Sequence, residues 1–543
     1  MVATPIDSRA AGEPTSAAPQ TRRQIALLCA LFFLLELAIL SFRISQAPDL
    51  FADEAFYTSI GNNIAAGRGL VENTGITFVW HPPLFPLIAA GYLKLTGLVD
   101  ADPIVQIYAL RQMNAIAGAL TAALLFAIGW RTRGRLCSIA VALLFCLDPY
   151  VQRINRRTML ETVAALLLIV GVWFFLRGLN ERRHGARYAV ATGVAIALAA
   201  LVKEFMLFGL LVMLIFAALY RRDQIKRVGL ASITALLVYG LYPLWIFFIG
   251  AWPAYAEMKT RQLFRLFSGL VKHAPAAAAP VNAPRISLWE NVTATMLPYA
   301  FSYMMIAAGS LLALIIIGRS LIRRRHVRED IALVALWVLI ADLLIGTSMV
   351  FGQGSDQFFY LVSVPVIILV GAALAAGAAR MFDAGGQTQA ADAQLRAPDT
   401  RLRPRWTMSR ALALGVLLVG ACWNIGTYVK VFVLSQDNGY AQVQSYVRQN
   451  VPLGATLEVG NELGNYIFPG YNVRFDRSPD LLHENGARYV ILSTKERWGG
   501  YNSVSHDFYD WVAANSVVRF EHEGPTFWNV RLFELTTPEA KKP

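Results

Sequence analysis

The sequence predicts a polytopic α-helical membrane protein that carries a small extracytoplasmic α/β domain at its C-terminal end. Three observations predict this class. Hydrophobic residues make up 56% of the 543 positions and charged residues only 16%, against about 25% charged residues in soluble domains. Several apolar runs approach or exceed the roughly 18 residues that indicate a membrane-spanning helix. From about residue 434 these runs give way to the shorter patterns of a soluble domain.

The N-terminal segment predicts a disordered tail followed by a membrane anchor. Residues 1–20 are rich in Ser, Ala, Pro, Gly and Thr. Arg22 and Arg23 then precede an apolar run that has no small-residue cleavage site before Arg43. A retained signal anchor is therefore favoured over a cleaved signal peptide. The four cysteines lie inside apolar runs, which predicts apolar side-chain packing rather than a disulfide framework or a metal site.

Clusters of lysine and arginine set the expected topology, because these residues concentrate in the cytoplasmic loops of membrane proteins. The same preference explains the net charge of +13 without a nucleic acid partner. The basic clusters are Arg22–Arg23, 131–135, 181–187, 221–227, 319–328 and 396–410. If all are cytoplasmic, the N-terminus lies inside, the C-terminus lies outside, and the chain crosses the membrane about 11 times. The expected spans are 24–42, 111–130, 136–150, 158–177, 187–202, 205–220, 228–249, 296–318, 331–350, 358–379 and 408–432.

Two outer loops interrupt the expected membrane domain, residues 21–433. The first, 43–110, contains the apolar segment 81–97, which is only about 14 residues long after its prolines and so predicts a juxtamembrane or re-entrant helix. The second loop, 251–295, opens with a stretch whose apolar and basic residues separate onto different helical faces. That pattern predicts an amphipathic interfacial helix.

Residues 434–543 predict a separate α/β domain on the outer face. The segment 440–450 has the pattern of a helix, and 455–460 and 488–494 have that of buried strands. Residues 517–535 alternate in the way expected of a hairpin around a Gly-Pro turn.

The topology brings ionisable residues to one membrane edge, the extracytoplasmic one. These residues are Asp53, Glu54, His81, Arg111, Arg153, Arg156, Arg157, Glu161, Lys203, Glu204 and Asp356. Ionisable residues at helix ends in membrane proteins are functional candidates. No basic residue lies closer in sequence to the acidic pair than Arg43 or Arg68, so both carboxylates are expected to be unneutralised.

Transfer of a sugar from a polyprenyl-phosphate donor fits this residue mix. The reaction needs a carboxylate that deprotonates an acceptor hydroxyl, and Asp53 or Glu54 would supply it. It also needs cations that bind the donor phosphate and stabilise the leaving phosphate, a role suited to Arg111, Arg156 or Lys203. The outer helices would form the wall of a groove for the lipid tail.

Three stretches, ADEAFY…IGNNIAAGRGL, HPPLFPLIAAGYLKLTG and YALRQMNAIAGAL, resemble the GT-C membrane glycosyltransferases. The similarity is greatest to bacterial relatives of protein O-mannosyltransferases (glycosyltransferase family 39) and to lipid A aminoarabinose transferases. In that family the first outer loop carries an acidic pair, a His-Pro-Pro-Leu-type motif and an arginine that opens the next span. The segments NRRTMLE, LVKEFMLF and DQFFYLVSVP resemble further family motifs, and the likeness of layout covers about residues 24–380.

The resemblance implies a role for each matched residue. Asp53 would be the general base, assisted by Glu54, and Glu161 would shape the acceptor side. The donor phosphate would bind to Arg111, Arg156 and Lys203, and the substrate to His81 and Tyr360. Family members often have Asp where Glu161 stands. Aminoarabinose transferases usually have Lys where His81 stands, so His81 favours the mannosyltransferase-like branch.

The expected protein is a multi-pass hexosyl- or pentosyltransferase of a bacterial plasma membrane that acts in the cell envelope. Its donor would be a polyprenyl-phosphate-linked sugar, and its acceptor a lipid, a polysaccharide or a protein. No metal ligands are predicted, and a divalent metal ion stays open as a cofactor. Two other classes stay open. One is a transporter or lipid flippase, which would favour internal repeats and mid-membrane charges. The other is a non-catalytic cell-envelope assembly protein that binds through its outer domain.

Three candidate residues also have purely structural interpretations. Asp53 would be the N-cap of a juxtamembrane helix that begins near Ala55. Arg111 would be an anchor whose long side chain reaches the membrane surface. Lys203 and Glu204 would neutralise each other in a polar turn between two spans.

Overall fold

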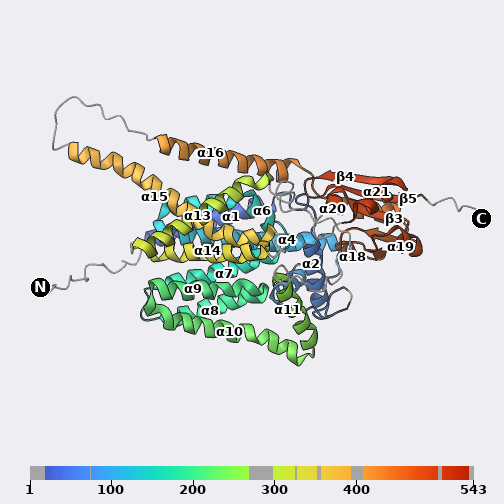
Figure 1. Ribbon diagram of the computed structural model, residues 1–543, viewed down its shortest axis with the longest axis horizontal. Coiled ribbons are helices and arrows are strands. Elements are labelled where there is room, and N and C mark those ends of the chain that lie inside the picture. The colour runs from blue at the N-terminus through green and yellow to red at the C-terminus, as the bar shows by residue number, and fades with distance from the viewer. Residues whose placement is uncertain are drawn as a thin grey trace, which may run out of the picture.

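The computed structural model describes residues 19–73, 75–267, 297–323, 327–350, 356–392, 408–498 and 504–536. A bundle of long helices occupies one end of the molecule and a mixed sheet with short helices the other (Figure 1). Almost all of the predicted N-terminal tail and the later part of the second outer loop lie outside the described residues.

Nine helices within the described segments are long and apolar enough to cross a membrane, which confirms the polytopic class. They include α1 (Pro19–Ser41), α4 (Pro103–Arg133), α7 (Leu160–Gly178), α8 (Gly185–Val202), α10 (Ile225–Phe248), α13 (Ala300–Arg323), α14 (Glu329–Val350), α15 (Tyr360–Asp392) and α16 (Met408–Tyr428).

The two remaining predicted spans are helical but irregular. The segment expected at 136–150 becomes α5 (Arg135–Cys146) and α6 (Pro149–Asn155), which meet at 65°. The bend follows from Asp148 and Pro149, because the Asp148 carboxylate caps the new helix and proline is tolerated at its first position. The segment at 205–220 begins with a 3₁₀ turn, η2 (Glu204–Leu207), so α9 (Phe208–Tyr220) is only 13 residues long.

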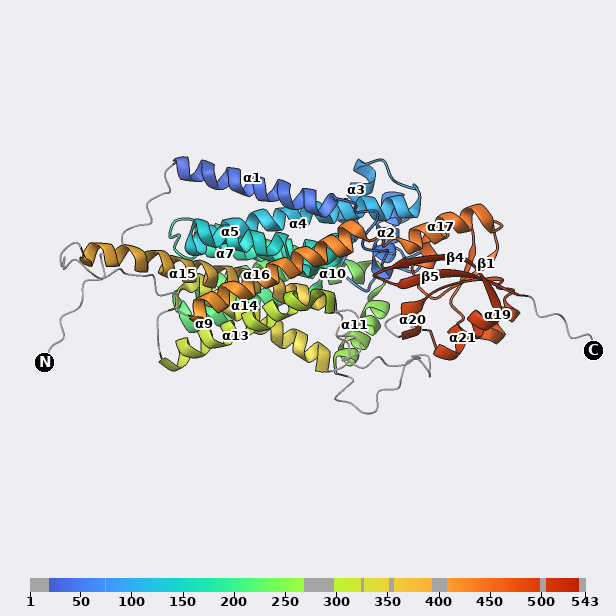
Figure 2. The same ribbon diagram turned by 90° about the horizontal axis from the view of Figure 1, so that it is seen from above.

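The first outer loop folds into two helices that pack on each other, α2 (Ala52–Ala65) and α3 (Leu84–Leu95). The 12-residue length of α3 agrees with a juxtamembrane helix rather than a span. The predicted amphipathic helix is present as α11 (Trp252–Phe267). Its Tyr255 and Met258 pack beside Val79, Tyr242 and Ile246. Figure 2 shows α2, α3 and α11 at the junction between the helical bundle and the sheet.

Gly61 permits the close packing of α2 on α3. A Cβ atom at this position would lie 2.9 Å from the Ala89 Cβ atom, and both atoms belong to rigid helices. Gly61→Ala is therefore expected to lower the free energy of unfolding by about 1–3 kcal/mol through overpacking. Gly91 is the matched control, because a Cβ added there meets no atom within 4 Å. Gly91→Ala should leave the stability unchanged or raise it slightly. Equal unfolding midpoints in detergent for the two variants would contradict the prediction.

The C-terminal domain is a five-stranded mixed sheet in the order β2-β1-β3-β5-β4. Its strands are β1 (Thr456–Val459), β2 (Asn472–Arg474), β3 (Tyr489–Ser493), β4 (Ser516–Gly524) and β5 (Trp528–Leu535). The first three are parallel, and β5 is antiparallel to β3 and β4. The helices are α17 (Gly439–Asn450), α18 (Gly464–Ile467), α19 (Pro479–Glu484), α20 (Thr494–Trp498) and α21 (His506–Ala514). The predicted α/β class of this domain is confirmed.

The outer domain is fixed to the first outer loop by polar contacts. The buried Asp49 carboxylate accepts hydrogen bonds from the backbone N–H of Tyr440 at 3.2 and 3.3 Å, at the N-terminus of α17. Arg448 forms an ion pair with Asp102. The pKa of Asp49 is raised to about 7 because burial and the nearby Asp437 carboxylate oppose its charge. The outer domain is therefore held against the membrane domain by contacts at both ends of α17, one to Asp49 and one to the N-cap residue of α4.

Candidate active site at the junction of the helical bundle and the sheet

Glu54 organises the start of α2. The helix begins at Ala52 with Phe51 as its N-cap residue, and the Glu54 carboxylate accepts the Phe51 backbone N–H at 3.0 Å. This is the return half of a capping box. Asp53 is therefore the second residue of the helix, and the expectation that it would be the N-cap is wrong.

The expectation that both carboxylates would be unneutralised is wrong for Glu54. Arg111 donates two hydrogen bonds to it, from Nε to Oε1 at 2.8 Å and from Nη2 to Oε2 at 2.7 Å. Both side chains are 0% exposed. The backbone N–H of Thr158 also donates to Glu54, at 2.8 Å. Together with Thr158, the pair joins α2, α4 and the turn before α7. Glu54 and Arg111 are 57 residues apart in sequence, so the residues around Glu54 do not predict this partner.

Arg111 has no N–H group left for a ligand. Its remaining donors bind the backbone carbonyls of Ile44 at 3.0 Å, Pro48 at 2.7 Å and Asp49 at 3.2 Å. This placement does not support the prediction that Arg111 binds the donor phosphate. The same placement rules out a side chain that extends to the membrane surface.

Arg156 is occupied in a similar way. It donates to the carbonyls of Ile39 at 3.0 Å and Ala47 at 3.2 Å, and also to that of Phe42. Its guanidinium carbon lies 4.8 Å from the centroid of the Phe432 ring, beyond the end of α16. The residue ties the end of α1 to the end of α16. This arrangement does not support phosphate binding by Arg156.

Arg157, the next residue, is not among the phosphate-binding residues that the family resemblance implies. Its side chain is 7% exposed, and it makes no hydrogen bond or ion pair with any described residue. The guanidinium carbon lies 5.2 Å from the centroid of the Phe51 ring. Burial, then the neighbouring Arg153 guanidinium, lower the pKa of Arg157. A buried guanidinium with free N–H groups is suited to an anion.

Asp53 differs from Glu54 in that no described residue pairs with its side chain. Its half-buried carboxylate makes no hydrogen bond and no ion pair within the described part of the chain. Burial raises the pKa of Asp53 to about 6, with a further contribution from Glu161 that Lys203 partly offsets. This group is ionised at neutral pH and more basic than an ordinary aspartate.

Lys203 and Glu161 form a buried ion pair between the ends of two spans. Glu161 lies in the first turn of α7, and Lys203 follows the last residue of α8. The Lys203 ammonium also lies 5.0 Å from the centroids of the Phe205 and Phe358 rings. Glu204 pairs instead with Lys259 of α11. The alternative that Lys203 and Glu204 neutralise each other is therefore wrong.

His81 lies where α11 meets the first outer loop. The ammonium of Lys259 donates to the carbonyl of Trp80 at 3.1 Å, and the His81 ring lies 6.2 Å from that of Tyr57. Burial, then Lys203 and Lys259, lower the pKa of His81 to about 3. The imidazole is therefore neutral and can exchange hydrogen bonds with hydroxyl groups, but it adds no positive charge for a phosphate.

Tyr360 is fully buried at the start of α15, and its hydroxyl donates to Asn155 Oδ1 at 2.7 Å. This contact makes it part of the packing around α6, so direct contact with a substrate is not supported. The side chain of Asp356 lies outside the described residues. Within the described part of the chain, no group of three or more His, Cys, Asp or Glu side chains is placed to hold a metal ion.

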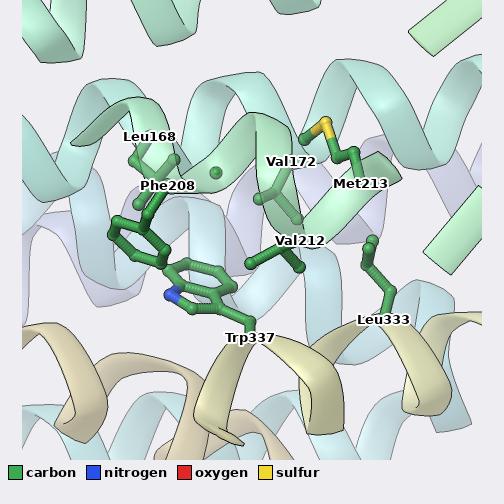
Figure 3. A pocket seen from close by; sticks show the side chains of 8 residues that line it. Leu168, Val172, Phe208, Val212, Met213, Leu333 and Trp337 are labelled. Atoms are coloured by element: carbon green, nitrogen blue, oxygen red, sulfur yellow. The ribbon is translucent and has the colours of Figure 1, made fainter. Parts of the chain in front are cut away.

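A small cavity in the bundle lies apart from these residues. Figure 3 shows its lining, which comes from α7, α9 and α14 and includes Leu168, Phe208, Val212 and Trp337. The lining side chains are apolar except for the indole N–H of Trp337. This cavity therefore lacks the ionisable groups that the predicted sugar transfer needs.

Comparison with known proteins agrees with the membrane fold. Residues 80–247 match the family described as dolichyl-phosphate-mannose-protein mannosyltransferase. No curated protein matches the chain.

The solved structures that cover nearly the whole chain include two with a bound lipid phosphate. The archaeal oligosaccharyltransferase AglB from Archaeoglobus fulgidus, in complex with an inhibitory peptide and a dolichol-phosphate, is 11% identical with a TM-score of 0.53. The alignment covers 97% of this chain and 75% of that one. ArnT from Cupriavidus metallidurans, bound to undecaprenyl phosphate, is 14% identical with a TM-score of 0.51, and the coverage is 97% and 100%. At these identities the likeness shows the fold.

Proposed function

We propose that this protein, which has the fold of the GT-C membrane glycosyltransferases, is an enzyme. It transfers a sugar from a polyprenyl-phosphate-linked donor to an acceptor hydroxyl. The reaction takes place at the extracytoplasmic face of a bacterial plasma membrane. One observation carries the proposal. No described residue pairs with the Asp53 carboxylate, and its helix is held in place by the buried Glu54–Arg111 pair. A catalytic group needs this combination of a free functional atom and a fixed backbone.

Asp53 acts as the general base in this proposal. The acceptor oxygen attacks the anomeric carbon of the donor sugar while Asp53 takes the hydroxyl proton. The bond between the anomeric carbon and the phosphate oxygen breaks, and the polyprenyl phosphate leaves with that electron pair. A carboxylate with a pKa of about 6 suits this step, because general bases work best with a pKa near the operating pH.

Lys203 keeps its expected role of binding the donor phosphate, and Arg157 takes the place of Arg111 and Arg156. Lys203 carries three N–H donors, of which Glu161 uses one. Arg157 keeps its N–H groups free of every described residue. Both cations would stabilise the charge that develops on the leaving phosphate. Glu161 then orients Lys203, and neutral His81 would hydrogen-bond a sugar hydroxyl.

The match of residues 80–247 to a mannosyltransferase family makes polyprenyl-phosphate-linked mannose the first donor to test. The experiment supplies this donor, labelled in the sugar, to the purified protein in liposomes together with extracts of its native envelope. Label should move to an acceptor with release of polyprenyl phosphate. Movement of the labelled lipid across the bilayer without transfer would instead favour a flippase. A protein that neither transfers nor moves the lipid would contradict both.

The pH dependence of transfer should report the protonation of Asp53. Because only the ionised carboxylate accepts a proton, the rate should fall as the pH drops through about 6 and decrease about tenfold per unit further down. The measurement is the initial rate at saturating donor from pH 4.5 to 8. A rate that stays constant down to pH 4.5 would contradict the assignment of Asp53 as the base.

A further inference from the structure

The outer domain brings one more carboxylate to the edge where Asp53 lies. Glu462 follows the carboxyl end of β1 and precedes α18. In α/β domains, residues at the carboxyl ends of parallel strands commonly form ligand sites. Here that end of the sheet faces the membrane domain, and Figure 1 shows α18 next to α2 and α4.

Packing fixes the Glu462 segment against α2. Leu463 and Ile467 belong to the same buried apolar cluster as Ala55, which lies two residues beyond Asp53. On the other side of the segment, the Tyr466 hydroxyl donates to Gln106 Oε1 of α4. The position of Glu462 relative to Asp53 is therefore set by contacts on both sides.

Glu462 presents an exposed carboxylate on the side of Asp53 that the outer domain covers. Its side chain is exposed and makes no hydrogen bond or ion pair with any described residue. The other charges around Asp53 come from Glu54, Glu161 and Lys203, and all three are engaged in buried pairs. The negative charge of Glu462 is close enough to Asp53 to contribute to its raised pKa.

Building on the proposed transfer, we propose that the outer domain completes the acceptor side of the site through Glu462. This carboxylate accepts a hydrogen bond from a second hydroxyl or an ammonium group of the acceptor and so positions the attacking hydroxyl beside Asp53. The acceptor is therefore neutral or cationic where it meets the outer domain. An anionic group at that point would be repelled.

The charges separate the two substrates. The anionic donor phosphate is attracted to Lys203 and Arg157, which belong to the membrane domain. Glu462 repels the phosphate and lies on the other domain. The donor thus approaches from the membrane side and the acceptor from the outer side, with Asp53 between the two sets of charges.

One test does not depend on transfer activity. The protonation of Asp53 is followed by the infrared carbonyl band of its protonated carboxyl group, which is identified as the band that disappears in Asp53→Asn. Glu462→Gln removes a negative charge, so the pKa of Asp53 should decrease. Glu484→Gln is the matched control, because Glu484 is exposed, pairs with no described residue and lies in α19 on the far side of the same domain. An unchanged midpoint in Glu462→Gln would overturn the placement of Glu462.

The second test measures acceptor binding. For the acceptor that becomes labelled in the envelope extract, Glu462→Gln should raise the KM about tenfold, the loss expected for one hydrogen bond to a charged group. The donor KM should stay unchanged or decrease, because the variant removes a charge that repels the phosphate. An acceptor KM equal to that of the wild type would overturn the positioning role, even with a shifted pKa for Asp53. If the wild-type protein transfers no sugar at all, the proposed function fails, and the infrared titration still decides whether Glu462 acts on Asp53.

Discussion

Asp53→Asn and Asp53→Ala are expected to abolish sugar transfer without unfolding the protein. Loss of a general base lowers the rate by about 10²–10⁴-fold, and neither variant can accept the acceptor proton. The side chain makes no hydrogen bond with any described residue, so its removal breaks no structural contact. The measurement is transfer from labelled lipid-linked sugar, with donor binding determined separately.

Stability gives this experiment a second, independent readout. The folded-state pKa of Asp53 is raised above its ordinary value of 3.8 to about 6. The ionised form is therefore unfavourable in the folded state. The contribution of Asp53 to the free energy of unfolding is fully present at low pH and is lost as the pH rises through about 6. At pH 7, Asp53→Asn should be at least as stable as the wild type. A variant that is both inactive and less stable would indicate a structural role.

Asp100→Asn is the matched control. Asp100 lies in the same outer loop and is exposed, and its ion pair with Arg68 at 3.2 Å involves two well-exposed side chains. The backbone there has φ of 60°, which asparagine tolerates as well as aspartate. This variant should keep full activity. Full transfer by both Asp53 variants would contradict the assignment of the general base.

The sequence predicts the architecture well because the signals are local. Long apolar runs, the positions of basic clusters and the short length of the 81–97 segment each depend on neighbouring residues only. They are enough to predict the helical membrane class, the juxtamembrane helix α3 and the outer α/β domain. The irregular spans also have local causes, Pro149 in one case and the η2 turn in the other.

The partners of the charged residues could not be predicted, because they lie far apart in sequence. Glu54 is neutralised by Arg111 and not by a neighbour, and Lys203 pairs with Glu161 rather than Glu204. The choice between Arg156 and Arg157 depends on which direction each side chain takes at the end of α6. A motif spacing identifies the segment that carries the chemistry, but the burial and the partners of each side chain decide which residue is free to act.

Breaking the Glu54–Arg111 pair is expected to have the largest effect on stability. Both groups are 0% exposed, so removal of one leaves the other as an uncompensated buried charge, at a cost of about 3–5 kcal/mol. Glu54→Gln leaves Arg111 charged, and Arg111→Met leaves Glu54 charged. Each variant should unfold at lower denaturant in mixed micelles. Transfer should also fall, because α2 no longer holds Asp53 in position.

The double variant Glu54→Gln/Arg111→Met distinguishes the pair from the individual side chains. It buries no unpaired charge, so its loss of stability should be clearly smaller than the sum of the two single losses. Arg111→Met still leaves the carbonyls of Ile44, Pro48 and Asp49 without their donor, so the double variant should not regain full stability. The exposed Arg261–Glu257 pair in α11 is the control, and Arg261→Met should cost less than about 1 kcal/mol. Additive losses in the double variant would show that Glu54 and Arg111 stabilise the protein independently of each other.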